Sequence, residues 1–101
     1  MNAKEELRKV LQGREILCAY IENIRSLEIP EVIARLSVGY IPSQYTQFME
    51  ALDFDYDAGY GRQEVFGLIW IADGTWYTRG EYDGSEWWEH HSCPKIPENM
   101  A

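Results

Sequence analysis

Two Asp-Gly dipeptides, Asp73-Gly74 and Asp83-Gly84, narrow the folds open to this chain more than any other pattern in it. Each lies between runs rich in β-branched and aromatic residues. Asp-Gly is a strong hairpin signal, because a two-residue type I′ turn needs a positive φ at both central positions. Two such turns in succession predict a three-stranded antiparallel meander in the C-terminal half.

A two-residue loop at each turn also fixes a register, in which Gly67 lies opposite Gly80 and Trp87 covers both. Arg79 then pairs with Trp88, where a guanidinium can stack on the indole. We expect one face to be core, with the residues Val65, Gly67, Ile69, Ile71, Trp76, Thr78, Gly80, Tyr82 and Trp87. The other face mixes aromatic and charged residues, namely Phe66, Leu68, Trp70, Tyr77, Arg79, Glu81, Glu86, Trp88 and His90.

The N-terminal half predicts two helices and two strands. Asn2 can cap a helix over 3–12 that Gly13 ends. Residues 15–24 fit a strand or a helix, and we choose a strand that forms a hairpin with a second strand over 32–40. Ser43 then caps a helix whose apolar stripe, Tyr45 to Leu52, either covers part of the mixed face or leaves that face for a partner.

Together these elements predict one α+β domain over residues 1–101, with the order α-β-β-α-β-β-β and a small antiparallel sheet of about five strands. A length of 101 residues suits one domain, and 46% hydrophobic with 26% charged residues is a globular composition. No apolar run approaches the length of a membrane span. Two cysteines, Cys18 and Cys93, are too few for a disulfide scaffold, so we expect a soluble cytoplasmic protein with free thiols.

The formal net charge of −8 is concentrated in the second half of the chain. Residues 1–52 hold seven acids and six bases, whereas residues 53–101 hold ten acids and three bases. Such a field repels nucleic acid and anionic membrane surfaces, and it favours a basic protein surface or a cation. We therefore expect a basic protein partner and no direct contact with DNA, RNA or membrane.

One segment resembles a calcium-binding loop. Asp53, Asp55, Asp57 and Glu64 fall at positions 1, 3, 5 and 12, as the oxygen ligands of an EF-hand do. The match is incomplete, because Ala58 stands where the loop needs glycine and a strand rather than a helix follows. A calcium or metal module is therefore an alternative to a solvated acidic loop.

Two further ligand sites can be read from the C-terminal half. The run Glu89-His90-His91-Ser92-Cys93 offers zinc ligand types, but neighbouring strand residues point to opposite faces and only Cys18 could add a ligand from elsewhere. Exposed aromatic rings can stack on sugars, which makes a small carbohydrate-binding domain a second alternative. The residues for that role are Tyr60, Trp70, Tyr77 and Trp88.

No catalytic motif is present, so we interpret the chain as a binding protein without a cofactor rather than an enzyme. The run Phe54-Asp-Tyr-Asp-Ala-Gly-Tyr-Gly61, followed by residues 66–89, resembles short uncharacterised proteins of phages and prophages, a likeness that spans residues 54–97. This resemblance implies an inhibitor, anti-CRISPR-like or otherwise directed against host defence, that mimics DNA with its carboxylates.

The mimic surface that we expect joins eight acids to two aromatic anchors, in a protein that is a monomer or a homodimer. These residues are Asp53, Asp55, Asp57, Asp73, Glu81, Asp83, Glu86, Glu89, Trp70 and Trp88. An uncharacterised structural role is the remaining alternative, with the acids serving solubility alone.

Overall fold

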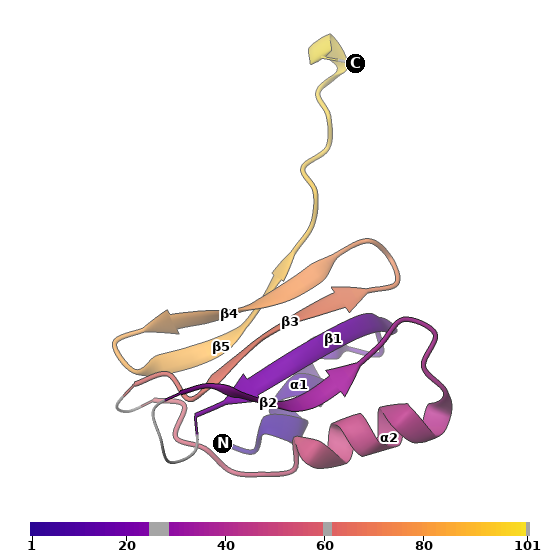
Figure 1. Ribbon diagram of the computed structural model, residues 1–101. Coiled ribbons are helices and arrows are strands. Elements are labelled where there is room, and N and C mark those ends of the chain that lie inside the picture. Colours follow the sequence, from indigo (N-terminus) through magenta and orange to yellow (C-terminus); the bar gives the residue numbers. More distant parts are fainter. Residues whose placement is uncertain (25–28, 60–61, 101) are drawn as a thin grey trace.

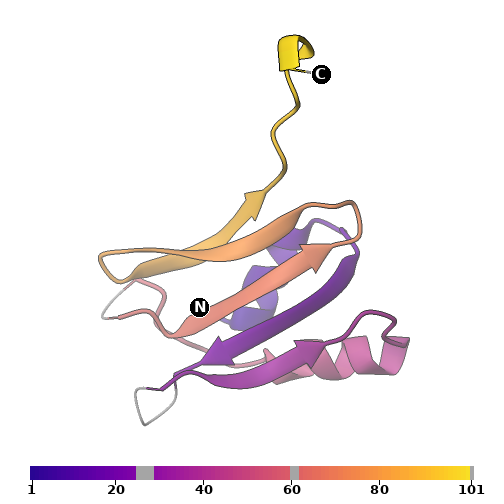
Figure 2. The same ribbon diagram turned by 45° about the horizontal axis from the view of Figure 1, so that its top comes forward.

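The computed structural model describes residues 1–24, 29–59 and 62–100 and has an α+β fold. Five antiparallel strands form one sheet in the order β2-β1-β3-β4-β5, and both helices lie on the same side of it (Figures 1 and 2). The elements are α1 (Ala3–Leu11), β1 (Ile16–Asn23), β2 (Glu31–Leu36), α2 (Pro42–Ala51), β3 (Val65–Ile71), β4 (Trp76–Tyr82), β5 (Ser85–His91) and the short 3-10 helix η1 (Glu98–Met100). The predicted order α-β-β-α-β-β-β is confirmed.

Helix α1 begins where its sequence predicts and ends at Leu11, one residue before the predicted end. The Asn2 side chain accepts a hydrogen bond from the Glu5 N–H at 3.0 Å, and Gln12 takes the left-handed conformation at the other end. Leu7 and Leu11 are buried against the sheet. Helix α2 begins earlier than predicted, with Ile41 rather than Ser43 at the N-cap and Pro42 in the first turn, where a missing N–H costs nothing.

Strands β1 and β2 form the predicted hairpin, and the strand interpretation of residues 15–24 is confirmed. Strand β2 is shorter than predicted, because a turn closed by the Tyr40 N–H and the Ser37 carbonyl oxygen ends it. Helix α2 packs on β2, with Phe48 and Met49 buried. The helix thus covers the same sheet face as α1, and Phe66, Leu68 and Trp70 of the predicted mixed face lie on the opposite side.

The turn between β3 and β4 differs from the prediction. Ile71 and Thr75 are joined by a hydrogen bond from the Ile71 N–H to the Thr75 carbonyl oxygen, so the loop holds three residues rather than two. Gly74 has a φ of +90°, as expected for a type I turn followed by a bulge residue. The predicted pairing of Gly67 with Gly80 is therefore wrong, since Leu68 pairs with Thr78 and Trp70 with Trp76.

This one-residue shift exchanges the faces of β4 and β5 relative to β3, because side chains alternate along a strand. Val65, Ile69 and Ile71 of β3 are buried as predicted, but Trp76, Thr78, Gly80, Tyr82 and Trp87 lie on the side away from the helices. Tyr77 and Trp88 take their place in the core. We call the uncovered side the open face; its residues include Cys18, Tyr20, Glu22, Val32, Arg35, Phe66, Leu68, Trp70, Trp76, Thr78, Trp87, Glu89 and His91.

The second hairpin has the predicted register. Asp83 and Gly84 have φ values of +50° and +88°, which is the type I′ pattern. Tyr82 pairs with Ser85, and Arg79 pairs with Trp88 as expected. Beyond β5 the chain extends away from the sheet to the C-terminus (Figure 1).

Within the described residues, none of the helices has the length and apolar composition that crossing a membrane would demand.

Candidate functional site

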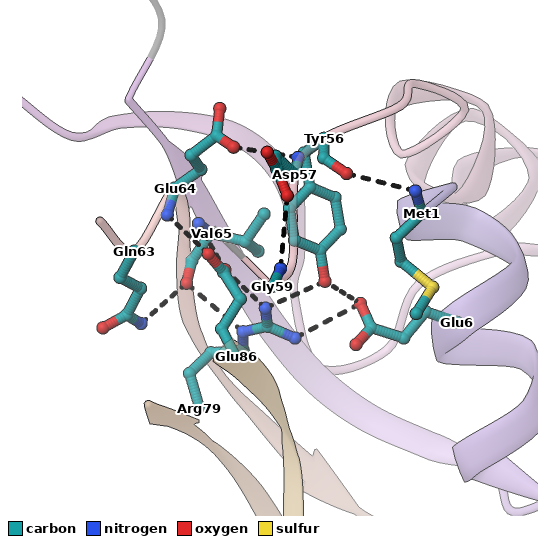
Figure 3. Close-up of polar contacts among 10 residues, drawn as sticks. All are labelled: Met1, Glu6, Tyr56, Asp57, Gly59, Gln63, Glu64, Val65, Arg79 and Glu86. Carbon is teal, nitrogen blue, oxygen red and sulfur yellow. Dashed lines mark hydrogen bonds and ion pairs between the residues drawn. The ribbon is translucent and has the colours of Figure 1, made fainter. Parts of the chain in front are cut away.

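A cluster of four polar side chains is buried between α1 and the meander (Figure 3). Arg79 from β4 donates through Nη2 to Glu86 Oε1 at 2.6 Å and to the Tyr56 hydroxyl at 3.1 Å, and through Nη1 to Glu6 Oε1 at 3.3 Å. The Tyr56 hydroxyl donates to Glu6 Oε1. We call these residues the buried cluster; it joins α1, the loop after α2, β4 and β5.

The surroundings of the buried cluster complete its hydrogen bonding. Glu86 accepts from the backbone N–H groups of Glu64 at 2.8 Å and Val65 at 2.9 Å, and Arg79 Nε donates to the Val65 carbonyl oxygen. The side chains of Arg79 and Glu86 are 2% and 0% exposed. Burial raises the pKa of Tyr56, and its hydrogen bond to the Glu6 carboxylate raises it further. The neighbouring oxygens keep the pKa of Arg79 above its ordinary value despite its burial. Within the described residues no buried side-chain polar atom lacks a partner, and the cluster is largely shielded from solvent.

Backbone contacts beside the buried cluster bring two acidic segments together at one end of the sheet. Gly59 forms an isolated bridge with Ser85, and the Glu86 N–H donates to the Ala58 carbonyl oxygen at 2.8 Å. A second bridge joins Asn2 to Asp55. The loop that follows α2 is thereby held beside the turn between β4 and β5, at the lower left of Figure 1.

Five of the eight predicted acids lie in the loop after α2, in the turn between β4 and β5, or at the end of β4 that leads into this turn, and all five are exposed: Asp53, Asp55, Asp57, Glu81 and Asp83. We call this group the acidic end. Beside it, Met1 and residues 55–59 line a shallow depression of about 610 Å³. In the part of the chain that the structure describes, none of the ion pairs engages these five carboxylates.

The other three predicted acids lie elsewhere. Glu86 is buried in the cluster, which contradicts its assignment to a partner surface. Asp73 is at the opposite end of β4, where hydrogen bonds from the Thr75 hydroxyl and N–H lower its pKa. Glu89 lies on the open face and accepts from Trp87 Nε1 at 3.0 Å.

The predicted aromatic residues also divide into exposed and buried ones. Trp70 is 39% exposed on the open face, as an anchor needs to be, whereas Trp88 is only 8% exposed. Tyr77 is also buried, so a sugar platform of Trp70, Tyr77 and Trp88 does not form. Tyr60 lies outside the described residues. Trp87 takes the position on the open face that the two-residue turn had given to Trp88.

The calcium ligands do not come together. Among the described residues, no group of three or more His, Cys, Asp or Glu side chains is placed to hold a metal ion. Asp57 accepts from the Gly59 N–H, and Glu64 accepts from the Asp57 N–H. Asp53 accepts from the Asn2 amide. The loop is organised by its own hydrogen bonds and by the N-terminus.

The predicted zinc ligands also separate, as strand geometry requires. His90 stacks on Tyr77 on the side of the helices, whereas His91 stacks on Trp76 on the open face. Cys18 lies across the sheet, where it pairs with Trp70. Sequence reasoning missed Glu6 and Tyr56 altogether, because nothing local links them to Arg79.

Comparison of the chain with protein-family models, with curated proteins and with solved structures found no match in any of the three.

Proposed function

We propose that the protein has a binding role without catalysis, and that its acidic end docks on a basic surface of a protein that handles nucleic acid. The observation that carries this proposal is the meeting of two acidic segments at one end of the sheet through the bridge of Gly59 with Ser85. Five exposed carboxylates from these segments belong to a chain with a net charge of −8.

Electrostatics support a basic partner. A surface group of exposed carboxylates attracts a basic groove over roughly one Debye length, about 10 Å at moderate salt, and speeds the encounter with it. Hydrogen bonds to Asp53 from Asn2 and to Asp57 from the Gly59 N–H hold these two carboxylates in place before binding. A surface ordered in advance loses less entropy on docking.

The resemblance of residues 54–97 to short phage and prophage proteins supports one class of partner. A host defence protein that grips DNA offers a basic groove into which the acidic end could fit in place of phosphates. On this proposal the protein inhibits such a host enzyme, in the manner of an anti-CRISPR or another anti-defence DNA mimic, and acts in the host cytoplasm.

Competition with DNA tests the proposal. Immobilised protein is exposed to a bacterial lysate at about 50 mM salt, and the bound proteins are then eluted with a short DNA duplex. We expect nucleic-acid-binding proteins to elute with DNA and to be released at about 300 mM salt, since exposed charges are screened there. Bound proteins that DNA fails to displace would contradict mimicry.

A charge-matched pair of variants makes this experiment specific. One variant carries Asp55→Asn, Asp57→Asn, Glu81→Gln and Asp83→Asn in the acidic end. The other carries Glu15→Gln, Glu50→Gln, Asp73→Asn and Glu98→Gln, which are exposed and lie outside it. Each changes the net charge from −8 to −4. Only the first variant should fail to capture the nucleic-acid-binding proteins, because the proposal depends on where the charges lie. Equal losses of capture in the two variants would show that only the net charge matters.

A further inference from the structure

The open face of the sheet carries a row of side chains with opposite charges at its two ends. Arg35 on β2 pairs with Tyr20, Tyr20 pairs with Leu68, Leu68 pairs with Thr78, and Thr78 pairs with Glu89 on β5. Directly opposed residues of neighbouring strands point to the same side of a sheet. The row therefore crosses all five strands, with a cation at one edge, an anion at the other and a leucine at its centre.

Such a row is complementary to itself. A two-fold axis that runs along β3, parallel to the strands, places β2 of one copy over β5 of the other and leaves positions along the strands unchanged. Arg35 of each copy then faces Glu89 of its partner, and Leu68 faces its own counterpart. Isologous interfaces have this reciprocal pattern, in which the contact of residue i with residue j occurs twice.

The open face has a hollow at one end of the row and aromatic rings at the other, which suits this two-fold axis. Beside the Arg35 end is a shallow hollow of about 450 Å³, whose lining includes Tyr20, Val32 and Trp70. Beside the Glu89 end are aromatic rings: Trp76 stacks on His91 with centroids 5.9 Å apart, and the Trp87 indole lies over Gly80 and donates a hydrogen bond to Glu89. The two-fold axis sets these rings over the hollow of the other copy.

Apolar exposure gives this contact its driving force. Trp70, Trp87 and Val32 are 39%, 37% and 47% exposed, and neither helix covers them. Aromatic residues and arginine are the types that interfaces favour. We propose that the open face is a homodimer interface, formed by two copies of this chain packed sheet to sheet about an axis along β3. This inference does not depend on the proposed function; in the dimer both acidic ends would lie at the same end of the assembly.

Charge reversal tests the interface. Within one chain Arg35 and Glu89 are separated by four strand spacings, roughly 19 Å, so they do not pair with each other. We expect the wild-type chain to sediment at twice the 11.8 kDa protomer mass. Arg35→Glu or Glu89→Arg alone should raise the dimer dissociation constant roughly tenfold or more, because each places like charges opposite each other twice.

Mixing the two single variants supplies the decisive result. In the mixed dimer the introduced glutamate faces the introduced arginine, and the native Glu89 of one chain faces the native Arg35 of the other. Equimolar Arg35→Glu and Glu89→Arg chains should therefore recover the dimer mass that neither holds alone. Glu50→Arg, on the exposed side of α2, is the control and should stay dimeric.

Circular dichroism of each variant is the check that it is folded. Three results would overturn the proposal: a wild-type chain that is monomeric at all concentrations, a dimer unaffected by the reversals, or folded variants that fail to recover on mixing.

Discussion

The guanidinium carbon of Arg79 lies 4.8 Å from the ring centroid of Trp88 on the paired strand, and both side chains are buried. Sequence pairing predicted this contact and left open whether its face is exposed. Its burial makes Arg79 the cation that two carboxylates, Glu6 and Glu86, depend on. The buried cluster also contains Tyr56, which belongs to the loop that carries three of the five acids of the acidic end. The fold and the proposed site therefore depend on the same cluster.

Removal of Arg79 tests that support. Arg79→Met keeps much of the apolar stem but leaves Glu6 and Glu86 buried without their cation, which should lower the free energy of unfolding by about 3–5 kcal/mol. Arg8→Met is the control, since Arg8 pairs with Glu5 on the surface and should cost about 0–1 kcal/mol. Urea denaturation measures both. Equal losses in the two variants would show that the buried cluster is not a stabilising element.

Ionisation of Tyr56 should lower the free energy of unfolding at high pH. Its pKa in the folded protein is raised above the ordinary value of 10.0, so the folded state holds the hydroxyl proton more tightly than the unfolded state does. This contribution is fully present below about pH 10 and is lost as the pH rises toward the folded value. Tyr56→Phe should therefore lose less stability between about pH 8 and about pH 11 than the wild type.

Tyr82→Phe is the matched control, because Tyr82 is 76% exposed. It should follow the wild-type pH dependence in chemical denaturation. A Tyr56→Phe protein with the same alkaline loss as the wild type would show that ionisation of Tyr56 does not cause that loss.

Two adjacent tryptophans test the register of the meander. Trp88→Ala empties a core position and should cost about 3–5 kcal/mol of unfolding free energy. Trp87→Ala, on the open face, should cost less than half as much when measured in dilute protein. Urea denaturation of the two variants distinguishes a three-residue loop from a two-residue loop at Asp73-Gly74. With the two-residue loop Trp87 would lie in the core, and Trp87→Ala would cost more unfolding free energy than Trp88→Ala.

Gly67 marks a close approach between β3 and β1. A Cβ atom at this position would lie 2.5 Å from the Tyr20 carbonyl oxygen, and backbone cannot move aside as a flexible side chain can. Gly67→Ala should therefore cost about 1–3 kcal/mol of unfolding free energy. Gly59→Ala, where a Cβ meets nothing within 4 Å, is the control and should change little. Similar thermal melting of the two variants would contradict this packing.

The two Asp-Gly turns explain what sequence reasoning could and could not predict. Both dipeptides correctly predicted hairpins, and the second correctly gave the register. At the first, Asp73 accepts from Thr75, and the loop takes in a third residue. The dipeptide is compatible with either loop. The observed register buries Tyr77, whose hydroxyl donates to the Val10 carbonyl oxygen in α1, a contact that no local pattern reveals.

The candidate site also depends on contacts between residues far apart in the sequence, so only part of it was predictable. The sequence placed the acids in one half of the chain, but the grouping of Asp57 with Asp83 depends on the bridge of Gly59 with Ser85. Charge alone could not separate Glu86 from the exposed acids. Its partner Arg79 also binds Glu6, which is 73 residues away in sequence.

Hydrogen exchange of the wild-type protein, alone and bound to the protein that DNA elutes, tests the docking of the acidic end most directly. We predict slower amide exchange on binding at residues 53–57 and 81–84, with α2 unchanged. Slower exchange confined to α2, or no change at the acidic end, would contradict this docking.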